Sequence, residues 1–193
     1  ATKENYPYDF ELKIKHVLEK NQVSVCWEII NHSNETMYFT IGGHPAFNVP
    51  AQGNDAKKED YLLTFNGEKS LTYLLLDPAS GTALPDQTKT LELTDGTCHI
   101  DAHMFDNDAL IFDNQIEKAG IAFPDGTPYL ELTCHRFPNF GIWSVPGSSF
   151  VCLEPWMGRC DDCGFKGDLS EKANINALNA DEIFNASYEI KIY

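Results

Sequence analysis

A carboxylate and an imidazole occur in two short motifs that lie far apart in the chain. The carboxylate, Glu154, ends the apolar run of residues 151–154 and is followed at once by Pro155 and Trp156. Because proline lacks an N–H and favours extended geometry in the residue before it, we expect a strand that ends at or near Glu154. A carboxylate at the rim of a β-scaffold, beside a flat aromatic side chain, can act as a base toward a polar, ring-shaped ligand. The alternative is a solvated glutamate at a strand end.

The imidazole, His44, lies in the motif of residues 42–48, which reads GGHPAFN. The two glycines allow a backbone turn, and the proline after His44 fixes the next step of the chain. His44 is therefore expected on a rigid elbow, where it could serve as an acid–base group. The alternative is a loop histidine with a structural hydrogen bond. Phe47 and Asn48, which follow directly, are counted among the candidate substrate-binding residues.

A third polar motif, FDNDALIF at residues 105–112, places two carboxylates just before a short apolar run. Either Asp106 or Asp108 could accept a hydrogen bond from a ligand hydroxyl. The alternative is ordinary turn chemistry, in which an aspartate side chain bonds to the backbone that follows it.

Length and charge limit the classes of function that remain. A chain of 193 residues is the usual size of one domain, so we expect a single domain over residues 1–193. The formal net charge of −15 disfavours nucleic acid and anionic membranes as partners, whereas neutral polyhydroxylated ligands are compatible with it. No apolar stretch is long enough to span a bilayer, and no leader opens the chain, so a cytoplasmic protein is expected. Because the first residue is Ala1 rather than Met, processing or a missing N-terminal segment is also expected.

Six cysteines are present, and two of them, Cys160 and Cys163, have the C-x-x-C spacing. A structural zinc site usually needs a second such pair, which the sequence lacks. The two aspartates between these cysteines disfavour a thiolate, so a redox role is also weakly supported. We therefore expect reduced thiols, with no metal and no cofactor.

Strand patterns fill most of the chain. Residues 10–15 and 23–29 alternate apolar with polar side chains around a short polar link, which predicts a hairpin with one buried face. About ten further short strands follow, separated by turn signals, and residues 166–181 are polar without a convincing helix. This pattern predicts an all-β sandwich.

The motifs at residues 42–48 and 153–162 together resemble those of the aldose 1-epimerase (galactose mutarotase) family, most closely its shorter bacterial branch. The stretches YPYDF at residues 6–10 and FDNDAL at residues 105–110 also resemble that branch, so the similarity runs from about Tyr6 to the C-terminus. The resemblance implies a large antiparallel β-supersandwich. It also implies interconversion of the α and β anomers of a free aldose.

By position in the family motifs, Glu154 resembles the base that deprotonates the anomeric hydroxyl, and His44 resembles the acid that protonates the ring oxygen. Asp108 resembles the acceptor of a sugar hydroxyl, with Asp106 as the alternative. Trp156 would stack on a sugar face, and Arg159 would orient a hydroxyl or Glu154. The resemblance implies no cofactor and no metal.

Family members also use an arginine and a second histidine upstream of the tyrosine–proline motif, at which this chain begins. We therefore expect either a fragment or a natural truncation, with the sandwich lacking its N-terminal part. Three alternatives to a hexose mutarotase stay open, and one of them is a structural or regulatory β-domain with no sugar site. The other two bind sugars. One is a hexose-6-phosphate 1-epimerase, which needs a cationic phosphate clamp that Arg136 and Arg159 would have to supply. The other is a carbohydrate-binding module without turnover. The sequence does not indicate an oligomeric state.

Overall fold

The computed structural model describes residues 2–193, so Ala1 and the expectation attached to it lie outside the described residues. These residues form sixteen β-strands and three short 3-10 helices. The strands are β1 (Phe10–Glu19), β2 (Gln22–Asn31), β3 (Met37–Phe39), β4 (Ile41–Gly42), β5 (Ala46–Asn48), β6 (Leu62–Phe65), β7 (Ser70–Asp77), β8 (Thr82–Glu92), β9 (Thr97–His99), β10 (Leu110–Asp113), β11 (Lys118–Ala122), β12 (Pro128–Thr133), β13 (Asn139–Trp143), β14 (Phe150–Met157), β15 (Asn176–Leu178) and β16 (Ile183–Ile192). The helices are η1 (Thr2–Glu4), η2 (Lys58–Asp60) and η3 (Leu169–Glu171).

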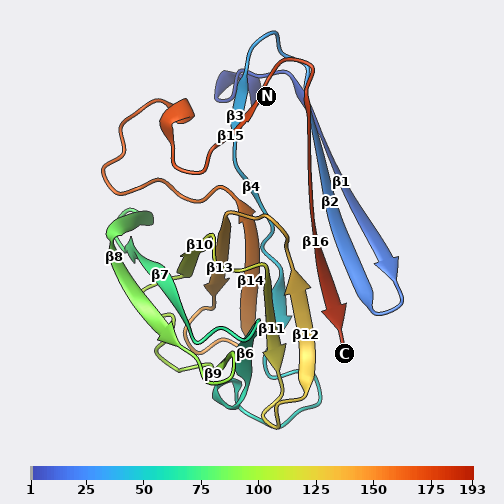
Figure 1. The fold of residues 1–193 in the computed structure, drawn as a ribbon, viewed down its shortest axis with the longest axis vertical. Coiled ribbons are helices and arrows are strands. Elements are labelled where there is room, and N and C mark those ends of the chain that lie inside the picture. The colour runs from blue at the N-terminus through green and yellow to red at the C-terminus, as the bar shows by residue number, and fades with distance from the viewer. Residues whose placement is uncertain (1) are drawn as a thin grey trace.

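Two seven-stranded antiparallel sheets make up most of the structure (Figure 1). One has the order β1-β2-β16-β12-β11-β6-β9, and the other has the order β4-β14-β13-β10-β7-β8, with β5 also paired to β14. A two-stranded sheet, β15-β3, completes the set. The fold is therefore all-β and antiparallel, as the strand patterns predict.

The main core lies between the two large sheets. Leu63 of β6 and Leu132 of β12 enter it from the first sheet, and Phe140 of β13 and Leu153 of β14 enter it from the second. All four side chains are fully buried. Burial of a side chain of this size contributes roughly 1.5–3 kcal/mol to stability. This packing fixes the position of β13 and β14, the two strands that carry most of the site described below.

Strand β14 continues past the position at which the sequence predicts its end. It runs to Met157, and Pro155 lies inside it, opposite Phe140 of β13. Pro155 accepts a hydrogen bond from the backbone N–H of Gly43, so its nitrogen faces the same side, where β4 and β5 are interrupted. Because no ladder bond is available at that point, the missing N–H of proline costs little and the strand does not stop.

The predicted hairpin of β1 and β2 is confirmed, but the expectation of one buried face holds only for β2. Val25, Trp27 and Ile29 of β2 are buried, whereas β1 is exposed along nearly its whole length. In Figure 1 this hairpin reaches beyond the strands of the opposite sheet. Leu12 and Ile14, which pair with Ile29 and Trp27, therefore have little to pack against among the described residues.

Two shorter segments also differ from the expectation. Residues 78–85 are predicted as a loop, but β8 begins at Thr82 and contains Pro85. β8 is the edge strand of its sheet, where a proline need not donate to a ladder. Residues 166–181 contain η3 and β15. None of the described helices is long and apolar enough to span a membrane.

Candidate active site

Glu154 is a buried carboxylate in the middle of a sheet. Its strand, β14, is flanked by β13, and Gly141 of β13 lies directly opposite. The Glu154 side chain is only 4% exposed. Burial raises the pKa of Glu154 to about 7; the nearby His44 and a side-chain hydrogen bond with Trp156 lower it, and the charge of Asp108 raises it. A carboxyl group with such a pKa can both accept and return a proton near neutral pH.

His44 lies on the elbow between β4 and β5, and both of these strands pair with β14. Two backbone hydrogen bonds tie the elbow to that strand: Gly43 donates to the carbonyl of Pro155 (3.0 Å), and Leu153 donates to the carbonyl of Pro45 (3.2 Å). The elbow therefore holds the imidazole beside Glu154, with Nε2 of His44 3.5 Å from Oε2 of Glu154. The ring of His44 is itself 61% exposed and meets Trp143 edge-on, at 6.0 Å between ring centroids.

The glycines of this elbow serve close packing rather than an unusual turn. Neither Gly42 nor Gly43 has a positive φ. A Cβ atom on Gly43 would lie 2.7 Å from the hydroxyl of Tyr188, a residue of β16 in the other sheet. Only glycine lets the elbow approach the opposite sheet this closely.

The two side chains open into a cavity of about 340 Å³, lined by His44, Asp108, Ala109, Trp143, Glu154 and Trp156. This volume lies within the range of small-molecule sites. A larger groove of about 440 Å³ lies elsewhere, between residues near Tyr6 and η3, and its lining contains no carboxylate or imidazole. The chemistry of the smaller cavity, rather than the size of the larger one, identifies the candidate site.

The family model described as aldose 1-epimerase matches residues 1–125, more than half of the chain. The chain belongs to the aldose 1-epimerase family. Two versions of protein LacX from Lactococcus lactis subsp. lactis, plasmid and chromosomal, are each 30% identical to this family member over 193 residues. That match covers 98% of this chain and 64% of LacX, so the chain spans less than two thirds of the length of that relative.

Solved structures of epimerase-family proteins have the same fold. The galactose mutarotase related enzyme from Lactobacillus acidophilus superimposes with a TM-score of 0.89 at 27% identity, covering 100% of this chain and 64% of that one. A galactose mutarotase-like protein from Lactobacillus casei ATCC 334 gives a TM-score of 0.83 at 22% identity, covering 100% and 66%. The fold of this family member is therefore the galactose mutarotase type of antiparallel β-supersandwich.

Trp156 lines the cavity in a position set by two glycines. Its indole lies over Gly42 of β4, which is its cross-strand partner, and over Gly141 of β13, which is the partner of Glu154. A Cβ atom on either glycine would lie 2.5 Å from an atom of the ring. The absence of side chains on both glycines lets the indole lie across the sheet beside Glu154, where a flat apolar surface faces the cavity.

Asp108 also lines the cavity, whereas the alternative Asp106 does not. The backbone of Asp108 is left-handed, with φ of 73°, and its Oδ1 accepts a hydrogen bond from the N–H of Ala109 (2.7 Å). Asp106 instead contacts the ring of His103 at 2.8 Å. The structure thus brings Asp108 to the same cavity as Glu154. Only Oδ1 of Asp108 takes part in this turn, and Oδ2 does not.

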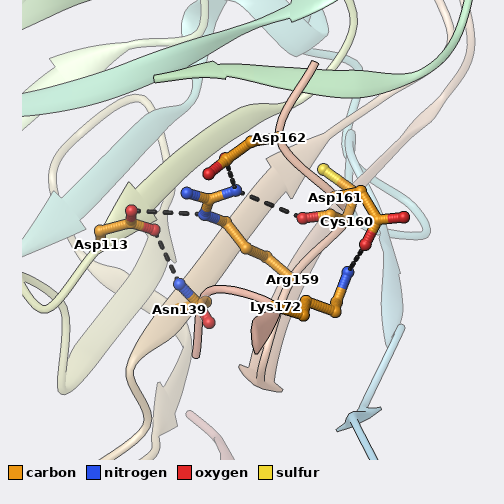
Figure 2. Close-up of polar contacts among 7 residues, drawn as sticks. All are labelled: Asp113, Asn139, Arg159, Cys160, Asp161, Asp162 and Lys172. Carbon is orange, nitrogen blue, oxygen red and sulfur yellow. Dashed lines mark hydrogen bonds and ion pairs between the residues drawn. The ribbon is translucent and has the colours of Figure 1, made fainter. Parts of the chain in front are cut away.

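Arg159 is not brought to the cavity, contrary to the expectation that it contacts the sugar or Glu154. The chain turns at Gly158, where φ is 97°, and directs Arg159 toward the end of β10. Figure 2 shows its guanidinium between two carboxylates, with Nε 3.3 Å from Asp113 and Nη1 2.6 Å from Asp162. Asn139 donates a hydrogen bond of 2.7 Å to the same Asp113. Arg159 is buried and tethers the segment after β14 to the sheet.

Phe47 and Asn48 also lie outside the lining of the cavity. Phe47 pairs with the core residue Val151 and packs against the main core, because it faces the opposite side of the sheet from Glu154. Asn48 pairs with Phe150 at the far end of β5 and is exposed. Strand alternation accounts for the placement of Phe47. Asn48 is on the same face as Glu154, but its partner Phe150 lies four residues before Glu154 along β14, which keeps Asn48 away from the cavity.

Two residues at the site, Trp143 and Cys152, are not among the candidates that the sequence motifs predict. Trp143 lines the cavity, and Cys152 lies beside it on β14, two residues before Glu154 and on the same face. The two are cross-strand partners, Trp143 of β13 with Cys152 of β14. The two-residue spacing of Cys152 and Glu154 in an expected strand places both on one face and is a signal for Cys152, whereas the place of Trp143 depends on the register between two strands.

Proposed function

We propose that this chain catalyses aldose 1-epimerisation, the interconversion of the α and β anomers of a free hexose. The observation that carries the proposal is the pairing of Glu154 with His44 at 3.5 Å in a cavity that fits one sugar ring. Membership of the aldose 1-epimerase family supports the same reaction class.

The close spacing suits the chemistry. The anomeric hydroxyl oxygen and the ring oxygen of a pyranose are bonded to the same carbon, so a base for one and an acid for the other must lie within a few ångströms of each other. Glu154 takes the proton of the anomeric hydroxyl while His44 protonates the ring oxygen, and the ring opens to the aldehyde. After rotation about the bond between C1 and C2, His44 takes the proton back from the ring oxygen as it attacks C1. Glu154 returns its proton to the carbonyl oxygen, and both groups are restored.

The remaining lining supplies recognition. Asp108 is placed to accept a hydrogen bond from a sugar hydroxyl, and the indoles of Trp156 and Trp143 offer apolar surface to the faces of a sugar ring. Arg159, Phe47 and Asn48 have no contact role in this proposal, since none of them lines the cavity.

The charges of the cavity favour a free sugar over a sugar phosphate. Glu154 and Asp108 are acidic, and no lysine or arginine is among the described residues that line it. The guanidinium of Arg159 is already held by Asp113 and Asp162. A phosphate group would meet two carboxylates with no lysine or arginine to pair with it, which is unfavourable.

Polarimetry tests the proposal. Freshly dissolved α-glucose or α-galactose, with the protein added, should approach the equilibrium rotation faster than buffer alone, in proportion to protein concentration. If the protein binds sugar by calorimetry but does not accelerate the mutarotation of several free aldoses, its function is that of a carbohydrate-binding module and not of an enzyme. Acceleration only with a hexose 6-phosphate would assign the phosphate-specific reaction instead.

A further inference from the structure

Three potential metal ligands converge beside the cavity. Among the residues that the structure describes, the group of His44, Cys152 and Glu154 places one ligand atom from each within 4.8 Å of the others. Cys152 and Glu154 alternate on β14 and project from the same face, and the elbow that carries His44 is tied to the same strand. The three ligands therefore lie on one hydrogen-bonded unit rather than on independent loops.

Their spacing is close to that of a tetrahedral site. Ligand bonds of about 2.0–2.3 Å to zinc imply separations of roughly 3.3–3.7 Å between ligand atoms. Nε2 of His44 and Oε2 of Glu154 are already 3.5 Å apart. No separation in the group exceeds the tetrahedral value by more than about 1 Å. Because His44 and Glu154 are already at the tetrahedral distance, any excess involves Cys152, and a side-chain rotation would have to close it.

The donor set selects the kind of metal. A thiol, an imidazole and a carboxylate together suit zinc, and its spectroscopic substitute cobalt, rather than the oxygen-seeking magnesium or calcium. Cys152 and Glu154 are 1% and 3% exposed, so a bound ion would be shielded on the protein side and open toward the cavity. The charge of a thiolate and a carboxylate balances that of a divalent ion, and Asp108 adds a further negative charge nearby.

We propose that His44, Cys152 and Glu154 form a binding site for Zn²⁺, with the fourth coordination position facing the cavity. On binding, the S–H bond of Cys152 breaks, its proton leaves to solvent and a sulfur–zinc bond forms. The bound ion uses the lone pairs of Glu154 and His44 Nε2 that acid–base catalysis requires. Zinc therefore inhibits the epimerase. The inhibition rests on the proposed function, whereas the binding does not.

Cobalt substitution tests the binding without an activity assay. The reduced chain, titrated with Co²⁺, should develop the near-ultraviolet band of a thiolate–cobalt bond at one ion per chain, and Zn²⁺ should abolish it. Cys152→Ser should remove the band and weaken zinc binding at least about 10-fold. Cys163→Ser is the matched control, because Cys163 is exposed and belongs to the C-x-x-C motif; it should leave the band unchanged.

If Cys152→Ser fails to fold, His44→Asn tests the zinc site instead. The His44 side chain is largely exposed, so its replacement leaves the core intact. It should weaken zinc binding by a similar factor. The proposal is overturned if the wild-type chain gives no thiolate–cobalt band. It is also overturned if the band persists in Cys152→Ser, or if Cys163→Ser removes it.

The activity arm separates the two proposals. Zinc should slow anomer exchange by the wild-type chain, a chelator should restore it, and Cys152→Ser should need at least about 10-fold more zinc for the same inhibition. Full activity with zinc bound would refute the claim that zinc inhibits by occupying Glu154 and His44. A chain that shows the band but never accelerates mutarotation would refute the proposed function and leave the metal site standing.

Discussion

Oε2 of Glu154 lies 3.5 Å from Nε2 of His44, yet the Glu154 side chain is 4% exposed and that of His44 is 61% exposed. The acid and the base thus differ sharply in environment although they are neighbours. Burial is the main reason that the pKa of Glu154 is raised to about 7, and the charge of Asp108 raises it further. The predictions below follow from this buried carboxylate and the residues that position it.

Asp108→Asn should shift the pH dependence of anomer exchange. Because the Asp108 charge raises the pKa of Glu154, its removal lowers that pKa, and Glu154 becomes a base at lower pH. The acid limb of the profile of kcat/KM against pH should move to lower pH. Loss of a sugar contact should also lower the maximum value of kcat/KM, but this does not move the limb. Asp106→Asn, which lies off the cavity, is the control and should leave the limb in place. A limb that stays fixed in Asp108→Asn would show that Glu154 does not set it.

The sequence predicts the two central residues of the candidate site but not all of its surroundings. Glu154 and His44 belong to motifs whose residue types indicate acid–base chemistry, and the structure brings them together. The motif containing Glu154 also suggested Arg159 as a contact, but the turn at Gly158 directs that side chain to Asp113. Membership of a motif does not reveal which way the chain turns after it.

The strand patterns likewise predict the all-β class but not every strand. Pro155 predicts a strand end, yet β14 continues through it because the proline nitrogen faces the interruption between β4 and β5. Trp143 enters the site through its register with Cys152. Both features depend on which strands become neighbours, and local sequence patterns do not specify that.

Glu154→Gln should stabilise the protein at high pH. Between the ordinary pKa of 4.5 and the folded value of about 7, the folded chain holds a proton on Glu154 that the unfolded chain releases. The wild type therefore loses stability as the pH rises through this window, and the loss is complete above it. Glutamine does not ionise, so Glu154→Gln should exceed the wild type in free energy of unfolding by about 1–3 kcal/mol at about pH 8, with little difference at about pH 4.

Urea denaturation at the two pH values measures this difference. Glu68→Gln is a control, because Glu68 is exposed and should change stability little at either pH. Equal destabilisation by Glu154→Gln at both pH values would contradict the buried, protonated carboxyl group.

Gly141→Ala should displace the indole of Trp156. The new Cβ atom would lie 2.5 Å from the ring, which packs against the strand and cannot easily move away. Overpacking of this kind costs about 1–3 kcal/mol of stability, and a displaced indole should also weaken sugar binding, seen as a raised KM. Gly126→Ala is the comparison: Gly126 has a positive φ but open space around it, so that change strains the backbone without touching the cavity. An unchanged KM in Gly141→Ala would argue against Trp156 as a sugar-stacking surface.

Arg159→Met should lower stability rather than sugar affinity. It leaves Asp113 and Asp162 without their shared cation, and because both carboxylates are partly exposed we expect a loss of about 2–3 kcal/mol, below that of a fully buried pair. Thermal or urea unfolding measures the loss, and calorimetry with the sugar measures affinity. The exposed pair of Lys13 with Glu28 is the comparison, and Lys13→Ala should change stability little. Weakened sugar binding by a well-folded Arg159→Met protein would restore Arg159 as a contact residue.

The most direct test is anomer exchange in Glu154→Gln, measured by two-dimensional exchange NMR at a sugar concentration that saturates the wild type, with binding measured on the same samples. If Glu154 is the base, exchange should fall by about 10²–10⁴-fold while sugar affinity stays close to that of the wild type, and His44→Asn should fall in the same range. Exchange by Glu154→Gln at the wild-type rate, with the sugar bound, would contradict the paired acid–base site.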